Sequence, residues 1–387
     1  MNATYLATAR LLTEIAPVVF ESGIFALKGG TAINLFLREM PRLSIDLDLV
    51  FTDHRIPRTE ALAAINAALR AGRDRLGKRG FKVHTTSAAD MGETKLLVQR
   101  DELLVKVEVN TVIRGAVHPV QLAALTAAAS DALMVDLELT LLSTEDIYGG
   151  KLVAAMDRQH PRDLFDVMEL FNHGGITPGI RRAFVVYLAS HNRAIHEVLF
   201  PTPKDIELAY TGSFVGLTTK PVRLETLVDT RERLFQELPA ALDVNEREFL
   251  RSLVRAEPDW SLLDIPHLEE LPAIRWRLQN LKQLSRSQPA RFLRLAESLD
   301  ARFAEIRTRA LVPRAAGSTR CQRARVPALA RARAPGLVAA WHPASRRVAR
   351  HPMEVAEPPT TVAQPARSFS CARRRAGRTS RAVMLAA

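Results

Sequence analysis

Residues 27–51 read LKGGTAINLFLREMPRLSIDLDLVF, a double glycine followed by two aspartates with one leucine between them. Alternate side chains of a β-strand point to opposite faces, so in a strand the leucines would face a core and Asp46 and Asp48 would share the other face. Two carboxylates that close can bind one divalent cation. An ordinary half-buried strand shows the same alternation, so the aspartates alone do not establish a metal site.

The glycine turn strengthens the metal interpretation. Gly29 and Gly30 precede a predicted helix, where backbone N–H groups can approach a phosphate, and Thr31 can add a hydroxyl donor. Glycines also permit a tight turn with positive φ and no ligand. Because the turn and the aspartate pair occur in one short stretch, the sequence favours a site for a nucleotide and magnesium.

A third carboxylate lies further along the chain. In residues 103–110, valines alternate with Lys106, Glu108 and Asn110, so Glu108 stands on the polar face of a predicted strand. A surface ion pair with a neighbouring lysine or arginine is the alternative for Glu108. The pattern predicts helices over 5–20, 31–38 and 59–79, and strands over 25–27, 46–51, 81–86, 94–100, 103–110 and 135–141.

Two helices follow the last predicted strand. Residues 143–146 indicate a helix cap with acids in the first turn. The helix after it presents Lys151 and Arg158 on one side, so both can point at one ligand. After Pro161, a second helix carries Asp163 and Asp166. Residues 179–309 are almost wholly helical in pattern, with turn signals at Pro201, Pro221, Pro239, Pro258 and Pro272.

The charge of the chain is unevenly distributed. The formal net charge is +12, but residues 310–387 contain 15 Arg, no Lys and only two acids, which leaves the rest of the chain near neutral. Few apolar residues accompany these arginines, so we expect a disordered tail. It could bind RNA, or it could be a C-terminus created by a change of reading frame. Both cysteines, Cys321 and Cys371, lie there, so residues 1–309 can form neither a disulfide nor a thiolate zinc site.

Length and composition predict an α+β protein with three parts. We expect a mixed sheet with flanking helices over 1–175, a helical domain over 176–309 and a disordered tail over 310–387. No charge-free apolar stretch is long enough to span a membrane, and no secretory signal begins the chain. The expected location is the cytoplasm.

Three motifs resemble one known family. LKGGTAINLF with residues 42–49 (RLSIDLDL), DIYGGKLVAAMDR and HPRDLFDVMEL are similar to the AbiEii/AbiGii toxin group, which belongs to the DNA polymerase β-like nucleotidyltransferase superfamily. The runs LETLVDTRERLF and EPDWSLLDIPHLEELPAIRWRLQNLKQL resemble the helical half of one bacterial branch. The resemblance covers about residues 5–300 and leaves out the tail.

The resemblance implies an activity and a set of site residues. It implies transfer of a nucleoside monophosphate from an NTP to an acceptor hydroxyl, with magnesium held by two aspartates. Relatives add nucleotides to the 3′ end of tRNA, act in abortive infection and pair with an antitoxin encoded nearby. The implied magnesium ligands are Asp46, Asp48 and Glu108, the nucleotide-binding residues are Gly29, Gly30, Thr31, Arg42, Ser44 and Lys151, and the later acidic position is Asp163.

Several alternatives stay open from the sequence. The acceptor could be a protein or a small molecule, and the chain could be a non-catalytic scaffold that binds RNA or a partner. Asp166 could replace Asp163, and either could pair with Arg158 or Arg162. In the helical half, we expect solvated surface rather than an RNA-binding face from the cations Arg181, Arg182, Arg193, Arg275, Arg277 and Lys282.

Overall fold

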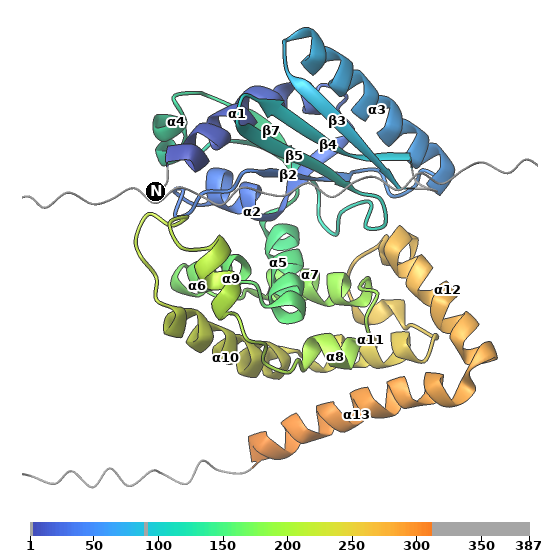
Figure 1. Cartoon of the computed structure of the whole chain (residues 1–387). Helices are drawn as coiled ribbons and strands as arrows, with labels where there is room; N and C mark the ends of the chain where they lie inside the picture. Colours follow the sequence, from blue (N-terminus) through green and yellow to red (C-terminus); the bar gives the residue numbers. More distant parts are fainter. Residues whose placement is uncertain (1–2, 89–91, 312–387) are drawn as a thin grey trace, which may run out of the picture. The chain divides into compact units, whose positions relative to one another are not determined.

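The computed structural model describes residues 3–88 and 92–311, which belong to one compact unit (Figure 1). A seven-stranded sheet and its helices come first along the chain. In order, these elements are α1 (Ala3–Phe20), β1 (Phe25–Lys28), α2 (Gly29–Thr31), η1 (Ala32–Leu37), β2 (Asp46–Phe51), α3 (Arg58–Lys78), β3 (Lys82–Ala88), β4 (Gly92–Arg100), β5 (Leu103–Asn110), β6 (Gln121–Ala124), α4 (Ala127–Leu133) and β7 (Glu138–Leu141).

The sheet is mixed, with the strand order β3-β4-β5-β2-β1-β7-β6. β2 pairs in parallel with β5 and β1 pairs in parallel with β7, whereas the other pairings are antiparallel. The register of β2 and β5 sets Asp48 beside Glu108 and Asp46 beside Lys106. The two central strands thus bring their polar residues into one row.

The two faces of the sheet have different neighbours. α1 and α3 pack against β4 and β5, where Leu47, Leu49 and the valines of β5 are almost fully buried. The opposite face carries the polar residues of β2 and β5 and lies toward the helical half (Figure 1). This alternation is the reason why one face forms a core and the other can form a site.

The second half of the described chain consists of helices. α5 packs on α6 and α7, α10 packs on α6, and α11 packs on α7. The elements are α5 (Thr144–Arg158), α6 (Pro161–Asn172), α7 (Pro178–Ala189), α8 (Ile195–Leu199), α9 (Glu207–Ser213), α10 (Leu224–Ala241), α11 (Val244–Val254), η2 (Trp260–Leu262), η3 (Leu268–Glu270), α12 (Pro272–Ser287) and α13 (Pro289–Leu311).

Local sequence explains where these helices begin. Ser143 caps α5 by accepting a hydrogen bond from the backbone N–H of Asp146, as its position before two acids predicts. Asp243 and Glu246 form a reciprocal capping box at the start of α11. The caps satisfy N–H groups that have no partner within the helix.

The α+β class and the mixed sheet are confirmed, and four details of the prediction are wrong. The turn of residues 29–37 is one short α-helical turn followed by the π-helix η1, rather than a regular helix over 31–38. The last strand starts at Glu138 rather than at residue 135, and the pattern missed β6 and α4. Pro239 was predicted to lie between helices, but it lies within the last turn of α10, which ends two residues later.

Two other predictions are not decided by the fold. The division at residues 175 and 176 stays a prediction, because all described residues belong to one unit. The tail prediction falls almost wholly on residues 312–387, which lie outside the described residues. Within the described ranges, no helix is both long and apolar enough to cross a lipid bilayer.

Candidate active site

A cleft of about 820 Å³ lies between the polar face of the sheet and helices α5, α6 and α7. Its walls include the end of β1 and the glycine turn, the row of polar residues on β2 and β5, and residues of α5 and α6. The predicted site residues that line it are Gly29, Gly30, Arg42, Ser44, Asp46, Asp48, Glu108, Lys151 and Asp163. The structure therefore brings together nine of the ten, and the exception is Thr31.

Both glycines are required by close contacts at this turn. Gly29 has φ +77°, and a Cβ atom there would lie 2.6 Å from Oδ2 of Asp48. A Cβ atom on Gly30 would lie 2.7 Å from Nη2 of Arg42 and 3.0 Å from Oγ of Ser44. Any larger residue would displace the side chains that line the cleft, so the double glycine allows the turn to pack directly against them.

Asp46 and Asp48 have no partner among the residues that the structure describes. Their side-chain oxygens form no ion pair or hydrogen bond with any residue in the described ranges, although both side chains are half-buried. Burial raises the pKa of Asp46, the Asp48 charge adds to this, and Lys106 and Arg162 oppose it. Two adjacent carboxylates with no direct ion pair repel each other, and a bound divalent cation would relieve that repulsion.

Thr31 is placed behind the site rather than in it. Its side chain is almost fully buried, and its hydroxyl group donates a hydrogen bond to the backbone oxygen of Asp46 at 2.5 Å. The same hydroxyl lies 3.0 Å from Oγ of Ser44. Thr31 thus ties the glycine turn to the start of β2, which fixes where the aspartates stand.

Asp163 and Asp166 are at the centre of a buried ion-pair network. Nζ of Lys151 lies 2.8 Å from Asp163 and 2.9 Å from Asp166. Arg42 forms a bidentate pair with Asp166 at 2.8 and 2.6 Å, and Arg158 contacts both oxygens of Asp163 at 2.5 and 2.9 Å. Lys151 and Arg158 do point at one group, as the sequence predicted. That group is the Asp163 carboxylate.

The network fixes the charge of its members. Burial opposes ionisation of both aspartates, but the charges of Lys151 and Arg158 hold the pKa of Asp163 far below its ordinary value. Arg42 and Lys151 likewise lower the pKa of Asp166. Burial lowers the pKa of Lys151, yet the two carboxylates outweigh it, and the net pKa is raised. All of these groups therefore stay charged at neutral pH.

Glu108 lies beside Asp48 but is already paired. Its two oxygens are 2.9 Å from Nζ of Lys95 and 3.0 Å from Nζ of Lys106, and these lysines lower its pKa against the effect of burial. No group of three or more His, Cys, Asp or Glu side chains arranged for a metal ion occurs within residues 3–88 and 92–311. A third metal ligand at Glu108 stays a prediction.

Lys28 was missed by the sequence analysis, and Arg162 was named there only as a possible ion-pair partner. Lys28 is the register partner of Asp48, and the side chains of Lys28 and Arg162 form no ion pair with any described residue. Burial lowers the pKa of Lys28, opposed by Asp48. The available signal was a lysine that ends an otherwise apolar strand directly before the double glycine.

Asp146, read from the sequence as a first-turn acid of α5, also holds the wall of the cleft. Its buried carboxylate accepts hydrogen bonds from the backbone N–H groups of Val117 and His118 at 2.8 and 2.9 Å and from the Tyr187 hydroxyl at 2.8 Å. It thus fixes the loop after β5 and helix α7 to the start of α5. No pattern in the sequence pointed to these long-range contacts.

Comparison with known proteins gives a family for this geometry. The family model described as nucleotidyl transferase AbiEii toxin, of type IV toxin-antitoxin systems, matches residues 10–280. Among solved structures, the chain is similar to MenT4, a nucleotidyltransferase toxin from Mycobacterium tuberculosis, with 19% sequence identity and a TM-score of 0.49. That similarity covers 72% of this chain and 94% of MenT4. No curated protein matches the chain.

The match spans most of the described residues and contains every residue that lines the cleft. The chain is therefore a nucleotidyltransferase that belongs to the AbiEii toxin family of type IV toxin-antitoxin systems.

Proposed function

We propose that the protein transfers a nucleoside monophosphate from an NTP to the 3′ end of tRNA in a magnesium-dependent reaction, as the toxin of an abortive-infection pair. The observation that supports this most directly is the unpaired Asp46 and Asp48, which stand against the glycine turn. The family supplies the reaction class and implies an NTP and a cognate antitoxin. Magnesium, tRNA and abortive infection are the parts that we add.

The two aspartates fit a hard divalent cation. They offer carboxylate oxygens on one face of one strand, and no arginine or lysine of the described residues forms an ion pair with them. Magnesium commonly binds through one or two carboxylates together with substrate phosphates. Bound there, it would neutralise phosphate charge and stabilise the attacking and leaving oxygens.

The residues around the aspartates fit a triphosphate. The backbone N–H groups of the glycine turn and the unpaired side chains of Lys28 and Arg162 offer donors and positive charge. Arg42 and Ser44 line the same wall, next to Gly30. We assign these groups to holding the nucleotide, with its reactive phosphate toward Asp46 and Asp48.

Three further predicted residues receive more specific roles. Thr31 positions the turn through its bond to Asp46, and the predicted phosphate contact of its hydroxyl would require that bond to rearrange. Asp163 positions Lys151 and Arg158 through direct ion pairs, so that their remaining donors can face the phosphates. Glu108 can join the metal site only by giving up Lys95 or Lys106.

In the proposed reaction, an acceptor hydroxyl attacks the α-phosphorus in line with the bond to the β-phosphate. The new bond joins the hydroxyl oxygen to phosphorus, and the hydroxyl proton passes to solvent. The old bridging bond breaks, and its electron pair leaves with pyrophosphate. Lys28, Lys151 and Arg162 offset the charge that develops on the leaving group. The chain contributes mainly by positioning and by a fixed arrangement of charge.

One assay tests the reaction and the acceptor together. The full chain is incubated with magnesium, total RNA and each of four α-labelled triphosphates, beside the Asp48→Asn variant. Asp53→Asn is the matched control, because Asp53 is an aspartate of the loop after β2 whose ion pair, among the described residues, is with Arg55. We expect label on small RNA from the wild type and the control and none from Asp48→Asn.

Other results would change the proposal in defined ways. Label on protein or on a small molecule, with RNA unlabelled, would replace tRNA by that acceptor class and keep the nucleotidyltransferase. Equal labelling by Asp48→Asn would remove the aspartate pair from the mechanism.

A further inference from the structure

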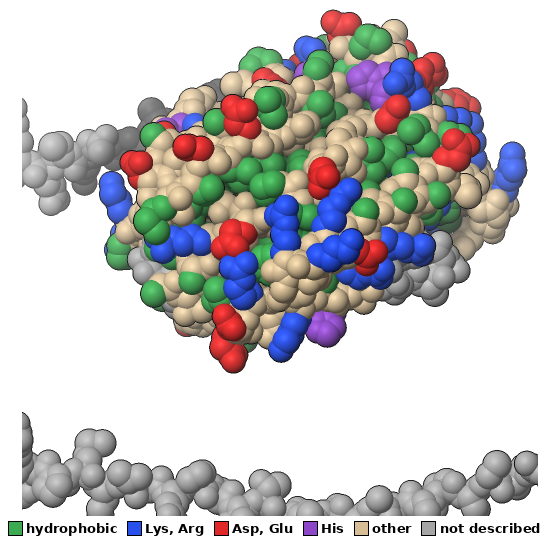
Figure 2. Space-filling model, turned by 90° about the horizontal axis from the view of Figure 1, so that it is seen from above, with side chains coloured by type: hydrophobic (Ala, Val, Ile, Leu, Met, Phe, Trp, Pro, Cys, Tyr) green, Lys and Arg blue, Asp and Glu red, His purple; other side chains and the backbone are tan. Residues whose placement is uncertain are grey.

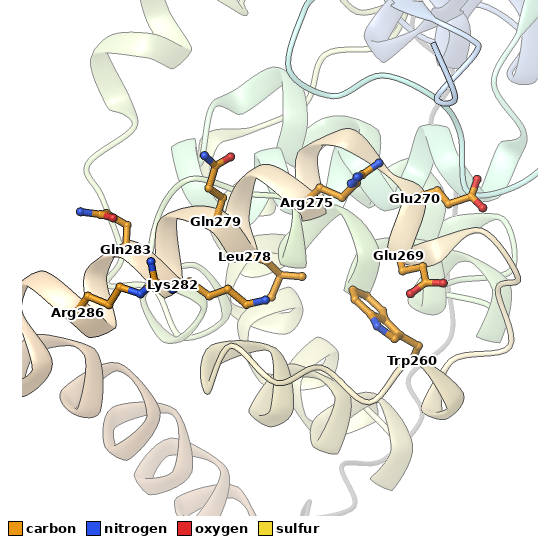
Figure 3. Close-up of a pocket in the computed structure, with 9 residues that line it drawn as sticks. All are labelled: Trp260, Glu269, Glu270, Arg275, Leu278, Gln279, Lys282, Gln283 and Arg286. Carbon is orange, nitrogen blue, oxygen red and sulfur yellow. The ribbon is translucent and has the colours of Figure 1, made fainter. Parts of the chain in front are cut away.

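A second groove lies on the helical half, outside the catalytic cleft. It has a volume of about 660 Å³ and runs along one face of α12 (Figure 3). Trp260 stands at one end with Glu269 and Glu270. The α12 residues in the groove follow helical spacing on one side and are Arg275, Leu278, Gln279, Lys282, Gln283 and Arg286.

The cations of this groove have no partner within residues 3–88 and 92–311. The side chains of Arg275, Lys282 and Arg286 are exposed and form no ion pair or hydrogen bond with any residue of the described chain. Two cations that the sequence placed in the same set, Arg181 and Arg193, are paired instead. Arg181 pairs with Asp243 and Glu246, and Arg193 pairs with Asp157 and Glu197.

The opposite side of α12 is anchored beside the catalytic cleft. Buried Arg277 donates to the backbone oxygens of His191 and Arg193, and His191 lines the cleft. At the other end, Glu270 bonds His54 at 3.2 Å, in the loop that follows β2. The contacts hold the groove next to the two walls that form the active site.

We propose that the α12 groove binds the phosphate backbone of the RNA acceptor while its 3′ end lies in the catalytic cleft. This inference rests on the proposed function, because it concerns how that acceptor is held. His54 follows Asp48 by six positions in the chain, so their Cα atoms are at most about 21 Å apart. An RNA whose 3′ end lies at the aspartates can therefore reach α12, and three exposed cations without a partner in the described chain favour a polyanion.

The spacing of the cations fits such a backbone. Arg275 and Lys282 are about 10 Å apart along the helix axis, and Lys282 and Arg286 are about 6 Å apart. Trp260 can stack on an unpaired base, as aromatic side chains do in single-stranded RNA sites. Glu269 repels phosphate at that end but can accept hydrogen bonds from base amino groups. The groove thus offers phosphate contacts along α12 and a base contact at Trp260.

The other charged face of the molecule looks different. The surface above α1 and α3 shows basic and acidic side chains interspersed (Figure 2). It includes Lys78 and Arg79 at the end of α3, which are exposed and have no ion-pair partner among the described residues. These two residues provide a control with the same change of charge at a distant site.

The test compares two double variants of the full chain, Lys282→Glu/Arg286→Glu and Lys78→Glu/Arg79→Glu. We measure the Kd for fluorescently labelled bulk tRNA at several salt concentrations by anisotropy, and the KM for tRNA in the transfer assay. The α12 variant should bind at least about tenfold more weakly and lose about 1 to 2 from the salt slope, since two phosphate contacts are removed. In the control, the change in log Kd should be less than about half of the change in the α12 variant, because the groove is intact.

Equal effects in the two double variants would overturn the inference. So would an unchanged Kd for tRNA together with lost binding of an acidic protein, which would assign the groove to a protein partner. Magnesium-dependent NTP affinity checks that each variant is folded. If the charge-reversal variant of α12 is not folded, Lys282→Gln/Arg286→Gln takes its place. If the wild type labels no RNA, the proposed function fails, whereas the Kd comparison still decides whether α12 binds RNA.

Discussion

Two aspartate pairs line or border the same cleft in opposite environments. Asp46 and Asp48 are half-buried and have no partner in the described chain, whereas Asp163 and Asp166 are buried and bound by Arg42, Lys151 and Arg158. The first pair has carboxylate oxygens left for a ligand. The carboxylate oxygens of the second pair already form ion pairs with side chains of the same chain. Residue type therefore does not separate a binding carboxylate from a positioning one, but its counterions do.

The largest expected effect is on the unpaired aspartates. Asp48→Asn should lower the transfer rate by about three orders of magnitude or more, equivalent to about 4 kcal/mol, because a metal ligand is lost. Its thermal stability should stay the same or rise slightly, since two adjacent negative charges no longer repel. The checks are single-turnover kinetics and Tm, and a large fall in Tm would place Asp48 with the structural pair.

The paired aspartates should respond in the reverse way. Asp166→Asn should cost about 3 kcal/mol or more of unfolding free energy, because buried Arg42 and Lys151 lose a counterion. Denaturant unfolding measures this, with Asp53→Asn as the control that should change little. An Asp166→Asn variant as stable as the wild type would contradict the structural role.

The same variant has a pH signature. The pKa of Asp166 is lowered in the folded state, so its contribution is present above the unfolded pKa of about 4 and is lost as pH falls through the folded pKa. The wild type should therefore lose stability in acid more steeply than Asp166→Asn.

Lys28 should show an intermediate effect on nucleotide binding. Lys28→Gln should raise the KM for NTP about tenfold with a smaller change in kcat, because an unpaired cation beside Asp48 no longer meets the triphosphate. Steady-state kinetics with NTP varied measure this, and Lys82→Gln at the start of β3 is the control. An unchanged KM would remove Lys28 from the nucleotide site.

The acid limb of activity should report on Asp46. Its pKa is raised by burial, so at limiting magnesium kcat/KM should fall as pH drops through a value above the ordinary 3.8. Because Lys106 lowers this pKa, Lys106→Gln should move the limb to higher pH. A limb that Lys106→Gln leaves in place would assign it to another group.

The smallest effect is expected at Glu108. Glu108→Gln should reduce transfer only about tenfold, since Lys95 and Lys106 compete with the metal for this carboxylate. Titration with magnesium separates the two possibilities. A raised magnesium requirement supports a third ligand, and an unchanged one leaves Glu108 as a surface ion pair.

Much of the site was predictable because its signals are local. The double glycine, the alternation in β2 and β5, and the cap of α5 act within a few residues, and each element appears close to where the pattern put it. Short or irregular elements were missed. β6 has four residues and no clear alternation, and η1 departs from regular helical hydrogen bonding where the turn packs on Arg42 and Ser44.

The sequence by itself determined the family, the sheet with its two faces, and the presence of two carboxylates on one strand, because these follow from local periodicity and short motifs. Only the tertiary structure decided which charges remain free. Asp163 lies next to Arg162 in sequence but binds Lys151 and Arg158, and Asp166 binds Arg42 from a distant loop. Which counterion each carboxylate meets depends on packing between segments that are distant in the sequence, and local periodicity does not encode that packing.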